Sequence, residues 1–289
     1  MQKLIYFLLI GCAIAPLAYY VKSKTINSGM TPTVEDIFIW GDSQMYRGVD
    51  GNYLSRLTGQ RVLNASRDGA GVYDFYVFSE NVPQNSLVIA ALSKTIFMRG
   101  PSRDRDMAGF SFDALYTLLD SGYKPWLLAR IIAKNSNPDQ LFELTNKLYP
   151  YNDSLVVHQP LSIFESFYSN KPDYFTSKFK VYEKALTLLK QKGCIVILVD
   201  FPFHPKLSDI QRTSPAYPLI RHVNYQSALR LEASIDTMTL ESNDKIMYDL
   251  THFNERSARL FTEQLSSEIS KATGSKALIV QINEVNARP

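Results

Sequence analysis

Uninterrupted apolar runs constrain the fold of this chain more than any other feature of its sequence. These runs lie within residues 37–40, 86–92 and 194–199, and residues 61–65, Arg-Val-Leu-Asn-Ala, are a further predicted strand. A strand that is covered on one face alternates apolar and polar residues, whereas a strand of a parallel sheet with helices on both faces is apolar throughout. The runs therefore predict a buried parallel sheet.

Longer amphipathic stretches separate these runs and complete the predicted fold. Helical spacing appears at 49–57, 72–79, 176–192, near 217–237 and at 254–270, where Asn254 is suited to cap the last helix. A short run at 245–249 is the fifth predicted strand. Strands that alternate with helices predict a three-layer α/β/α sandwich with a mainly parallel five-stranded sheet, similar to the flavodoxin arrangement.

The middle of the chain, about residues 95–173, interrupts this alternation. It is rich in Tyr, Phe, Asn and Pro, and we interpret it as an irregular insertion with helices at 112–121, 126–134 and 139–147. The whole of 34–272 is then one domain, followed by a tail at 273–289. A chain of 289 residues with 45% hydrophobic residues is long enough to bury one large core.

The N-terminal segment, residues 1–24, is predicted to lie outside this domain. Its stretch from Leu4 to Val21 carries no charge, and Lys22 and Lys24 follow it. Its 18 residues are just enough to span a bilayer as a helix. We predict a single anchor in a bacterial inner membrane, followed by a linker at 25–33 and a periplasmic domain.

Two other interpretations of this segment remain open. Ala13-Ile14-Ala15 matches a signal-peptidase site, which indicates a secreted protein, although Pro16 would follow the cut directly. Residues 9–12 resemble a bacterial lipobox that ends at Cys12, which indicates a lipoprotein. All three interpretations place the domain outside the cytoplasm.

Charge and cysteine content exclude several classes of function. The net charge is +3 and the Lys and Arg residues are scattered, so the sequence does not indicate nucleic-acid binding. Cys12 and Cys194 are the only cysteines, too few for a disulfide framework or a zinc site. Motifs for phosphate or metal binding are absent, and we expect no metal and no organic cofactor.

Two short motifs carry the chemistry. Gly41-Asp42-Ser43 follows the first strand, and Asp249-Leu250-Thr251-His252 follows the predicted fifth strand. An Asp three residues before a His can hold the Nδ1–H group and leave Nε2 free as a base. Because the carboxyl ends of parallel strands meet at one edge, we predict a site with Ser43 as nucleophile, His252 as base and Asp249 as its orienting acid.

These motifs resemble those of the SGNH, or GDSL-like, hydrolase superfamily of esterases, lipases and carbohydrate acyl-transferring enzymes. Residues 41–43 match its first block, residues 64–69 look like its second, and residues 249–252 match its last. The resemblance implies that Ser43 is the nucleophile and that the amide of Gly69 belongs to the oxyanion hole.

The third block of the family departs from this pattern. The family places an Asn there as a side-chain donor to the oxyanion, whereas this chain has Ser93 and Lys94. Either side chain is a candidate donor. The alternative is an oxyanion hole made of the backbone amides of Ser43 and Gly69 alone.

The anchor and the resemblance together imply a membrane-bound enzyme of the cell envelope. Similar anchored members acylate or deacylate bacterial surface polysaccharides, such as alginate acetylation proteins and the teichoic-acid D-alanylation protein. We therefore expect an extracytoplasmic serine esterase or O-acyltransferase that acts on acyl esters, acetyl esters in particular, of a carbohydrate, with polysaccharide assembly proteins as partners. A non-catalytic protein for polysaccharide binding or assembly is the alternative, and a lipase is a third option.

Three further residues are candidates for substrate contacts. Tyr46 and Arg47 follow the nucleophile and suit a saccharide or an anionic group, although a surface role at the start of a helix is an equal alternative. His204 follows the fourth strand and lies either in the pocket wall or in a structural loop.

Overall fold

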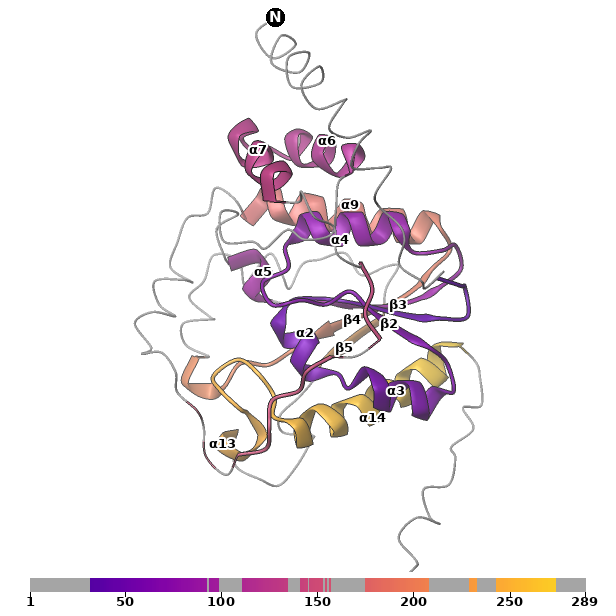
Figure 1. Cartoon of the computed structure of the whole chain (residues 1–289), viewed down its shortest axis with the longest axis vertical. Coiled ribbons are helices and arrows are strands. Elements are labelled where there is room, and N and C mark those ends of the chain that lie inside the picture. Colours follow the sequence, from indigo (N-terminus) through magenta and orange to yellow (C-terminus); the bar gives the residue numbers. More distant parts are fainter. Residues whose placement is uncertain are drawn as a thin grey trace, which may run out of the picture.

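The computed structural model describes residues 32–92, 94–98, 111–134, 141–144, 146–152, 154, 156, 175–207, 229–232 and 243–273. Its strands form one sheet in the order β2-β1-β3-β4-β5, and all four neighbouring pairs are parallel (Figure 1). The strands are β1 (Ile37–Trp40), β2 (Val62–Asn64), β3 (Leu87–Ala91), β4 (Ile195–Asp200) and β5 (Leu229–Glu232).

Helices cover both faces of the sheet, which explains the continuous apolar runs. One face packs against α4 (Val72–Asn81) and α9 (Phe175–Gln191), with α6 (Phe112–Asp120) and α7 (Pro125–Lys134) outside them (Figure 1). The other face packs against α2 (Ser43–Gly48), α3 (Gly51–Thr58) and α14 (Glu255–Thr273).

Strand β1 shows why both faces need apolar side chains. Phe38 and Trp40 belong to the core cluster on the α4 and α9 side, whereas Ile37 and Ile39 belong to the cluster on the α14 side. All four are fully buried. The predicted three-layer α/β/α sandwich with a parallel sheet is therefore confirmed.

The predicted fifth strand at 245–249 is wrong. Residues Asn243–Ile246 form the short helix α13, and the bridge between Met247 and Phe253 closes the loop after it. Strand β5 instead lies at Leu229–Glu232, inside the segment where we expected a helix. Both errors have one cause: a run of four or five residues has no decisive period, so pairing with β4 decides the structure.

A helix predicted at 139–147 is also wrong. The described residues 141–144 and 146–147 of this segment are not helical. Glu143 instead pairs with Asn64 as an antiparallel bridge, with N···O distances of 2.8 Å in both directions. The free edge of β2 offers backbone hydrogen bonds there, and the amino-acid pattern of 139–147 does not reveal this partner.

Other helices are confirmed with shifted ends. The expected helix at 49–57 is α3, which begins at Gly51 because the carboxylate of Asp50 accepts a hydrogen bond from the amide of Tyr53 and caps it. The preceding short helix α2 was not predicted. Asn254 caps α14 as predicted, with its side-chain oxygen 3.1 Å from the amide nitrogen of Ser257.

The predicted membrane anchor at 1–24 and linker at 25–33 lie outside the described residues, except for residues 32–33. Among the described helices, none combines the length and the apolarity needed to cross a bilayer. The tail from residue 274 onward also lies outside the described part.

Candidate active site

The turn after β1 places Ser43 at the first position of α2, beside the point where the strand order changes direction between β1 and β3. Ligands of open parallel sheets bind at such points, outside the carboxyl ends of the strands. Only glycine fits at position 41, because a Cβ atom there would clash with Met45 Cβ and lie 2.7 Å from Ala91 Cβ. The sharp turn that presents Ser43 therefore depends on Gly41.

Asp42 supports this turn and is fully buried. One of its carboxylate oxygens accepts a hydrogen bond from the amide of Gln44 at 3.0 Å and caps α2. The other accepts a hydrogen bond from the hydroxyl of Thr95 in α5 (Lys94–Met98). Asp42 thus holds the nucleophile turn against the segment that follows β3, and its role is structural.

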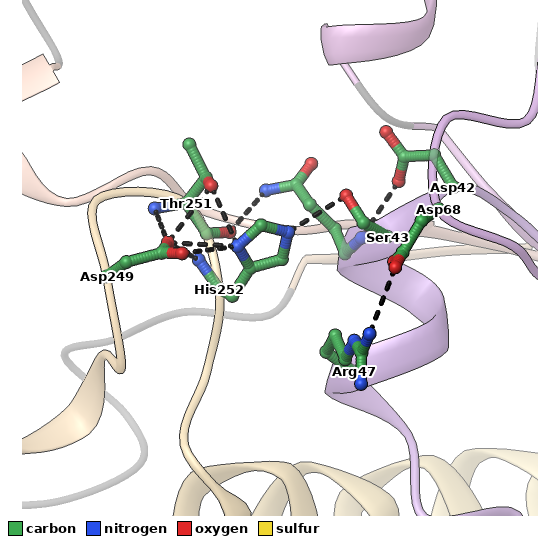
Figure 2. A network of polar contacts seen from close by, with 8 residues as sticks. Asp42, Ser43, Arg47, Asp68, Asp249, Thr251 and His252 are labelled. Atoms are coloured by element: carbon green, nitrogen blue, oxygen red, sulfur yellow. Dashed lines mark hydrogen bonds and ion pairs between the residues drawn. The ribbon is translucent and has the colours of Figure 1, made fainter. Parts of the chain in front are cut away.

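Ser43, His252 and Asp249 form a continuous hydrogen-bonded relay (Figure 2). The Oγ atom of Ser43 lies 2.8 Å from Nε2 of His252, and Nδ1 of the same ring lies 2.8 and 2.9 Å from the two carboxylate oxygens of Asp249. A carboxylate at Nδ1 keeps the proton there and leaves Nε2 as the acceptor for the serine proton. The structure thus brings together all three residues that the sequence predicted.

The environment of Asp249 keeps it ionised. Burial raises the pKa of its carboxyl group, but the hydrogen bond and the attraction from His252, together with hydrogen bonds from Thr251, outweigh burial. The pKa of Asp249 therefore lies below its ordinary value. The side chains of His252 and Asp249 are only 14% and 19% exposed, so little water competes for their hydrogen bond.

The loop that carries the relay is fixed by contacts from other elements. Gln44 donates from its side chain to the carbonyl oxygen of Thr251 at 2.9 Å, which links α2 directly to the loop. The amide nitrogen of His204 lies 2.9 Å from the carbonyl oxygen of Leu250. These contacts connect the loop to the ends of β1 and β4.

Gly69 lies in a turn that contacts the nucleophile turn. The amide of Arg67 donates to the carbonyl of Gly41 at 3.0 Å, and Gly69 has a φ of +84°, a conformation that favours glycine. The structure therefore brings the second block next to the first, as the expected oxyanion role of Gly69 requires.

Only part of the proposed third block is described. Ser93 lies outside the described residues, and so does the side chain of Lys94, whose backbone begins α5. Their expected roles as oxyanion donors stay predictions.

Arg47 and His204, two of the three predicted substrate-contact residues, are held in protein contacts. The guanidinium of Arg47 donates to the carbonyl of Lys147 at 2.9 Å and to Asp68 at 3.0 Å, and it packs over the ring of Tyr46. His204 is 3% exposed, and its Nδ1 accepts from the amide of Lys206 at 3.2 Å. Tyr46 is only partly buried, and its expected contact with a substrate stays a prediction.

Sequence reasoning missed four residues that build the site, namely Gln44, Thr95, Tyr149 and Thr251. The Thr251 hydroxyl lies 3.0 Å from Nδ1 of His252 and 3.1 Å from Asp249. Gln44 and Thr251 lie inside or beside the recognised motifs, and that proximity was the available signal. Nothing in the sequence singled out Thr95 or Tyr149.

No cluster of three or more His, Cys, Asp or Glu side chains within the described ranges has the arrangement of a metal site. The relay itself supplies a nucleophile, a base and an orienting carboxylate, which are the groups needed for acyl transfer through serine.

No protein-family model and no curated protein matches this sequence. Solved structures that are similar to it include two bacterial proteins. A GDSL-like lipase from Bacteroides thetaiotaomicron is 13% identical with a TM-score of 0.38, and the match covers 88% of this chain and 98% of that one. A protein assigned as an acylhydrolase from Bacteroides fragilis is 12% identical with a TM-score of 0.38, and the match covers 88% and 96%.

Proposed function

We propose that this protein is a serine-dependent esterase or O-acyltransferase that works through an acyl-Ser43 intermediate. The supporting observation is the relay from Ser43 Oγ through the ring of His252 to the carboxylate of Asp249, with every link at 2.8–2.9 Å. A serine hydroxyl is a weak nucleophile at neutral pH and needs a base within hydrogen-bond reach. Here the base is in place, and its orientation is fixed by Asp249.

Acylation follows from this geometry. Oγ of Ser43 attacks the ester carbonyl carbon while Nε2 of His252 takes the serine proton. The tetrahedral intermediate collapses as its C–O bond to the leaving group breaks, and Nε2 returns the proton to the departing alcohol. Asp249 stabilises the transient imidazolium and stays ionised.

The acyl-serine bond is then cleaved by a second hydroxyl compound. Nε2 of His252 removes a proton from water or from a sugar hydroxyl, and that oxygen attacks the acyl carbon. Ser43 leaves and recovers its proton from Nε2. Water yields a free acid, whereas a sugar yields a transferred acyl group.

The oxyanion of both tetrahedral states needs donors, and we assign the backbone amides of Ser43 and Gly69 to this role. The contact between Arg67 and Gly41 supports the assignment, because it holds the turn that contains Gly69 against the turn that contains Ser43. Ser93 or Lys94 adds a side-chain donor in this proposal.

We propose an acylated carbohydrate of the cell envelope, with acetyl as the acyl group, as the substrate. The support is the uncharged stretch from Leu4 to Val21, which suits an anchor that keeps the domain at the outer face of an inner membrane. Polysaccharide assembly proteins are the corresponding partners. An assay of an acetylated oligosaccharide, with and without an unacetylated acceptor, separates released acetate from transferred acetyl groups.

The proposed nucleophile is tested with the full chain in detergent. A fluorophosphonate probe should label Ser43, as identified in the labelled peptide, and p-nitrophenyl acetate should be hydrolysed. Ser43→Ala should lose both, whereas Ser270→Ala, near the end of α14 remote from the site, should retain both. Unchanged esterase activity in Ser43→Ala would sink the proposal.

A second candidate function, polysaccharide binding or assembly without catalysis, is favoured by one observation. The chain has Ser93-Lys94 where the resembling family places its oxyanion Asn. This candidate would be supported if the wild-type protein does not react with the fluorophosphonate probe but still binds an acetylated polysaccharide. Hydrolysis of long-chain esters in preference to acetyl esters would instead indicate a lipase.

A further inference from the structure

Residues 146–149 connect the nucleophile helix to the loop of the catalytic base. At the first end, the side-chain amide of Asn146 donates to the carbonyl oxygens of Tyr46 and Val49, at 2.6 and 2.5 Å. Its oxygen accepts a hydrogen bond from the amide of Gly51 at 3.2 Å. The segment is therefore attached to the end of α2 and the start of α3.

The other end of the segment is attached beside His252. The amide of Glu255, at the start of α14, donates to the carbonyl of Tyr149 at 2.7 Å. The ring of Tyr149 stacks on Tyr248 with a centroid distance of 4.1 Å and an interplanar angle of 4°. It also packs edge-on against the imidazole of His252, at 5.4 Å and 64°.

The ring of Tyr149 has no face left for a substrate. Tyr248 fills one face, and two rings only 4.1 Å apart leave no room for a guanidinium between them. The guanidinium carbon of Arg47, 4.7 Å from the ring centroid, therefore covers the other face. A sugar needs an open face of an aromatic ring to stack on. Because both faces of the Tyr149 ring are covered, the ring contacts other side chains of the protein and not a ligand.

Arg47 joins this ring to the rest of the site. Its side chain is 13% exposed and makes an ion pair with Asp68, the residue before Gly69 (Figure 2). It also holds the carbonyl of Lys147, inside the connecting segment. From the nucleophile helix, this one guanidinium thus contacts the turn of the oxyanion donor and the ring that packs on the base.

We propose that Tyr149, held by Arg47, is a positioning residue that sets where the imidazole of His252 lies relative to Ser43. The inference rests on the proposed acyl-serine chemistry for its kinetic consequences. It assigns Arg47 to positioning and not to the substrate contact expected from its place after the nucleophile. Asp249 fixes the proton on Nδ1, whereas the Tyr149 ring packs against the imidazole and limits where the ring can move.

The kinetic test compares Tyr149→Leu with Tyr149→Phe and with Tyr116→Leu, a matched change on the outer helix α6, where Tyr116 is 61% exposed. Displacing a reacting group by about 1 Å can cost on the order of 10²-fold in rate. We expect Tyr149→Leu to lower kcat about 10- to 100-fold with an unchanged KM for p-nitrophenyl acetate. Tyr149→Phe and Tyr116→Leu should stay near wild type.

A second variant keeps the proposal testable if Tyr149→Leu does not fold. Arg47→Met keeps a long side chain but removes the charge, both hydrogen bonds and the contact with the ring. Positioning predicts a fall in kcat with KM unchanged. A raised KM with unchanged kcat would identify Arg47 as a substrate contact and overturn the proposal.

A readout that does not need turnover separates this proposal from the proposed function. The chain has four His residues, so 15N-histidine labelling gives signals from four imidazole rings, and His252→Asn assigns those of His252. Wild type should show one sharp set of His252 ring signals in the Nδ1–H tautomer. Tyr149→Leu should keep this tautomer, because Asp249 still holds Nδ1, but its His252 ring signals should shift or broaden as the imidazole samples several positions. An unchanged signal would refute positioning even if the wild type proves inactive with every ester.

Discussion

Nε2 of His252 lies 2.8 Å from Oγ of Ser43, although 209 residues separate them in the chain. The distance is that of a hydrogen bond between a base and the hydroxyl it is to deprotonate. The contact exists because the turn after β1 places Ser43 at the start of α2, and the loop after α13 reaches the same edge of the sheet.

The first prediction concerns Asp249, whose carboxylate holds Nδ1 of His252. In Asp249→Asn the oxygen that accepts from the amides of Thr251 and His252 can remain, so the fold should persist. The amide nitrogen would favour the wrong imidazole tautomer, and kcat should fall by about 10⁴-fold. Esterase kinetics check this, with Asp113→Asn on α6 as control. A loss below tenfold would contradict the relay.

Two single substitutions can identify which side chain of the third block donates to the oxyanion. Removal of one donor typically costs about 10²–10³ in kcat. We expect such a loss in either Ser93→Ala or Lys94→Met, measured with p-nitrophenyl acetate under saturating conditions. Near wild-type kcat in both variants and in the double variant would instead assign the hole to the amides of Ser43 and Gly69.

Gly41 provides a test of the nucleophile turn. In Gly41→Ala the new methyl group would clash with Met45 and press on Ala91, and overpacking typically costs about 1–3 kcal/mol. We expect a lower free energy of unfolding in urea and a lower rate of fluorophosphonate labelling. Gly51→Ala is the matched control, because the nearest atoms to its added Cβ lie at 3.5 and 3.6 Å. Equal effects in the two variants would show that the turn tolerates a side chain.

Asp36 provides a prediction for acid stability. Its burial raises the pKa, but hydrogen bonds from Arg61 and Thr33 and the charge of Arg61 outweigh burial, so the pKa of Asp36 is lowered. A carboxyl group whose pKa is lower in the folded state stabilises the fold above its unfolded pKa of about 4. That stability is lost as the pH falls through the lower folded value.

Asp36→Asn should therefore be less stable than wild type at pH 7, by about 1.5–3 kcal/mol, since hydrogen bonds to charged groups contribute in that range. The difference should shrink as the pH drops below 4. Urea unfolding at pH 7 and at pH 3 measures both. Glu35→Gln, at the exposed neighbouring position, is the control. A difference that does not depend on pH would show that the Asp36 charge is not involved.

Much of the fold could be predicted because it is encoded locally. Residues 37–40 and 86–92 are apolar on both faces of a strand, and only a doubly covered sheet buries them all. The structure of two short segments, by contrast, could not be predicted from their local sequence. Residues 229–232 are Leu-Arg-Leu-Glu and form an edge strand, whereas residues 245–249, Lys-Ile-Met-Tyr-Asp, include the end of a helix. At that length, pairing with β4 outweighs the local pattern.

The sequence by itself determined the buried sheet and the chemical identity of the relay. Ser43, Asp249 and His252 sit in short motifs whose chemistry follows from residue type and spacing. Only the tertiary structure decided what surrounds the relay, such as Thr95 on Asp42 or Tyr149 between Arg47 and Tyr248. The physical reason is that a motif is a local property, whereas a packed ring or a donor from another element depends on where distant segments meet.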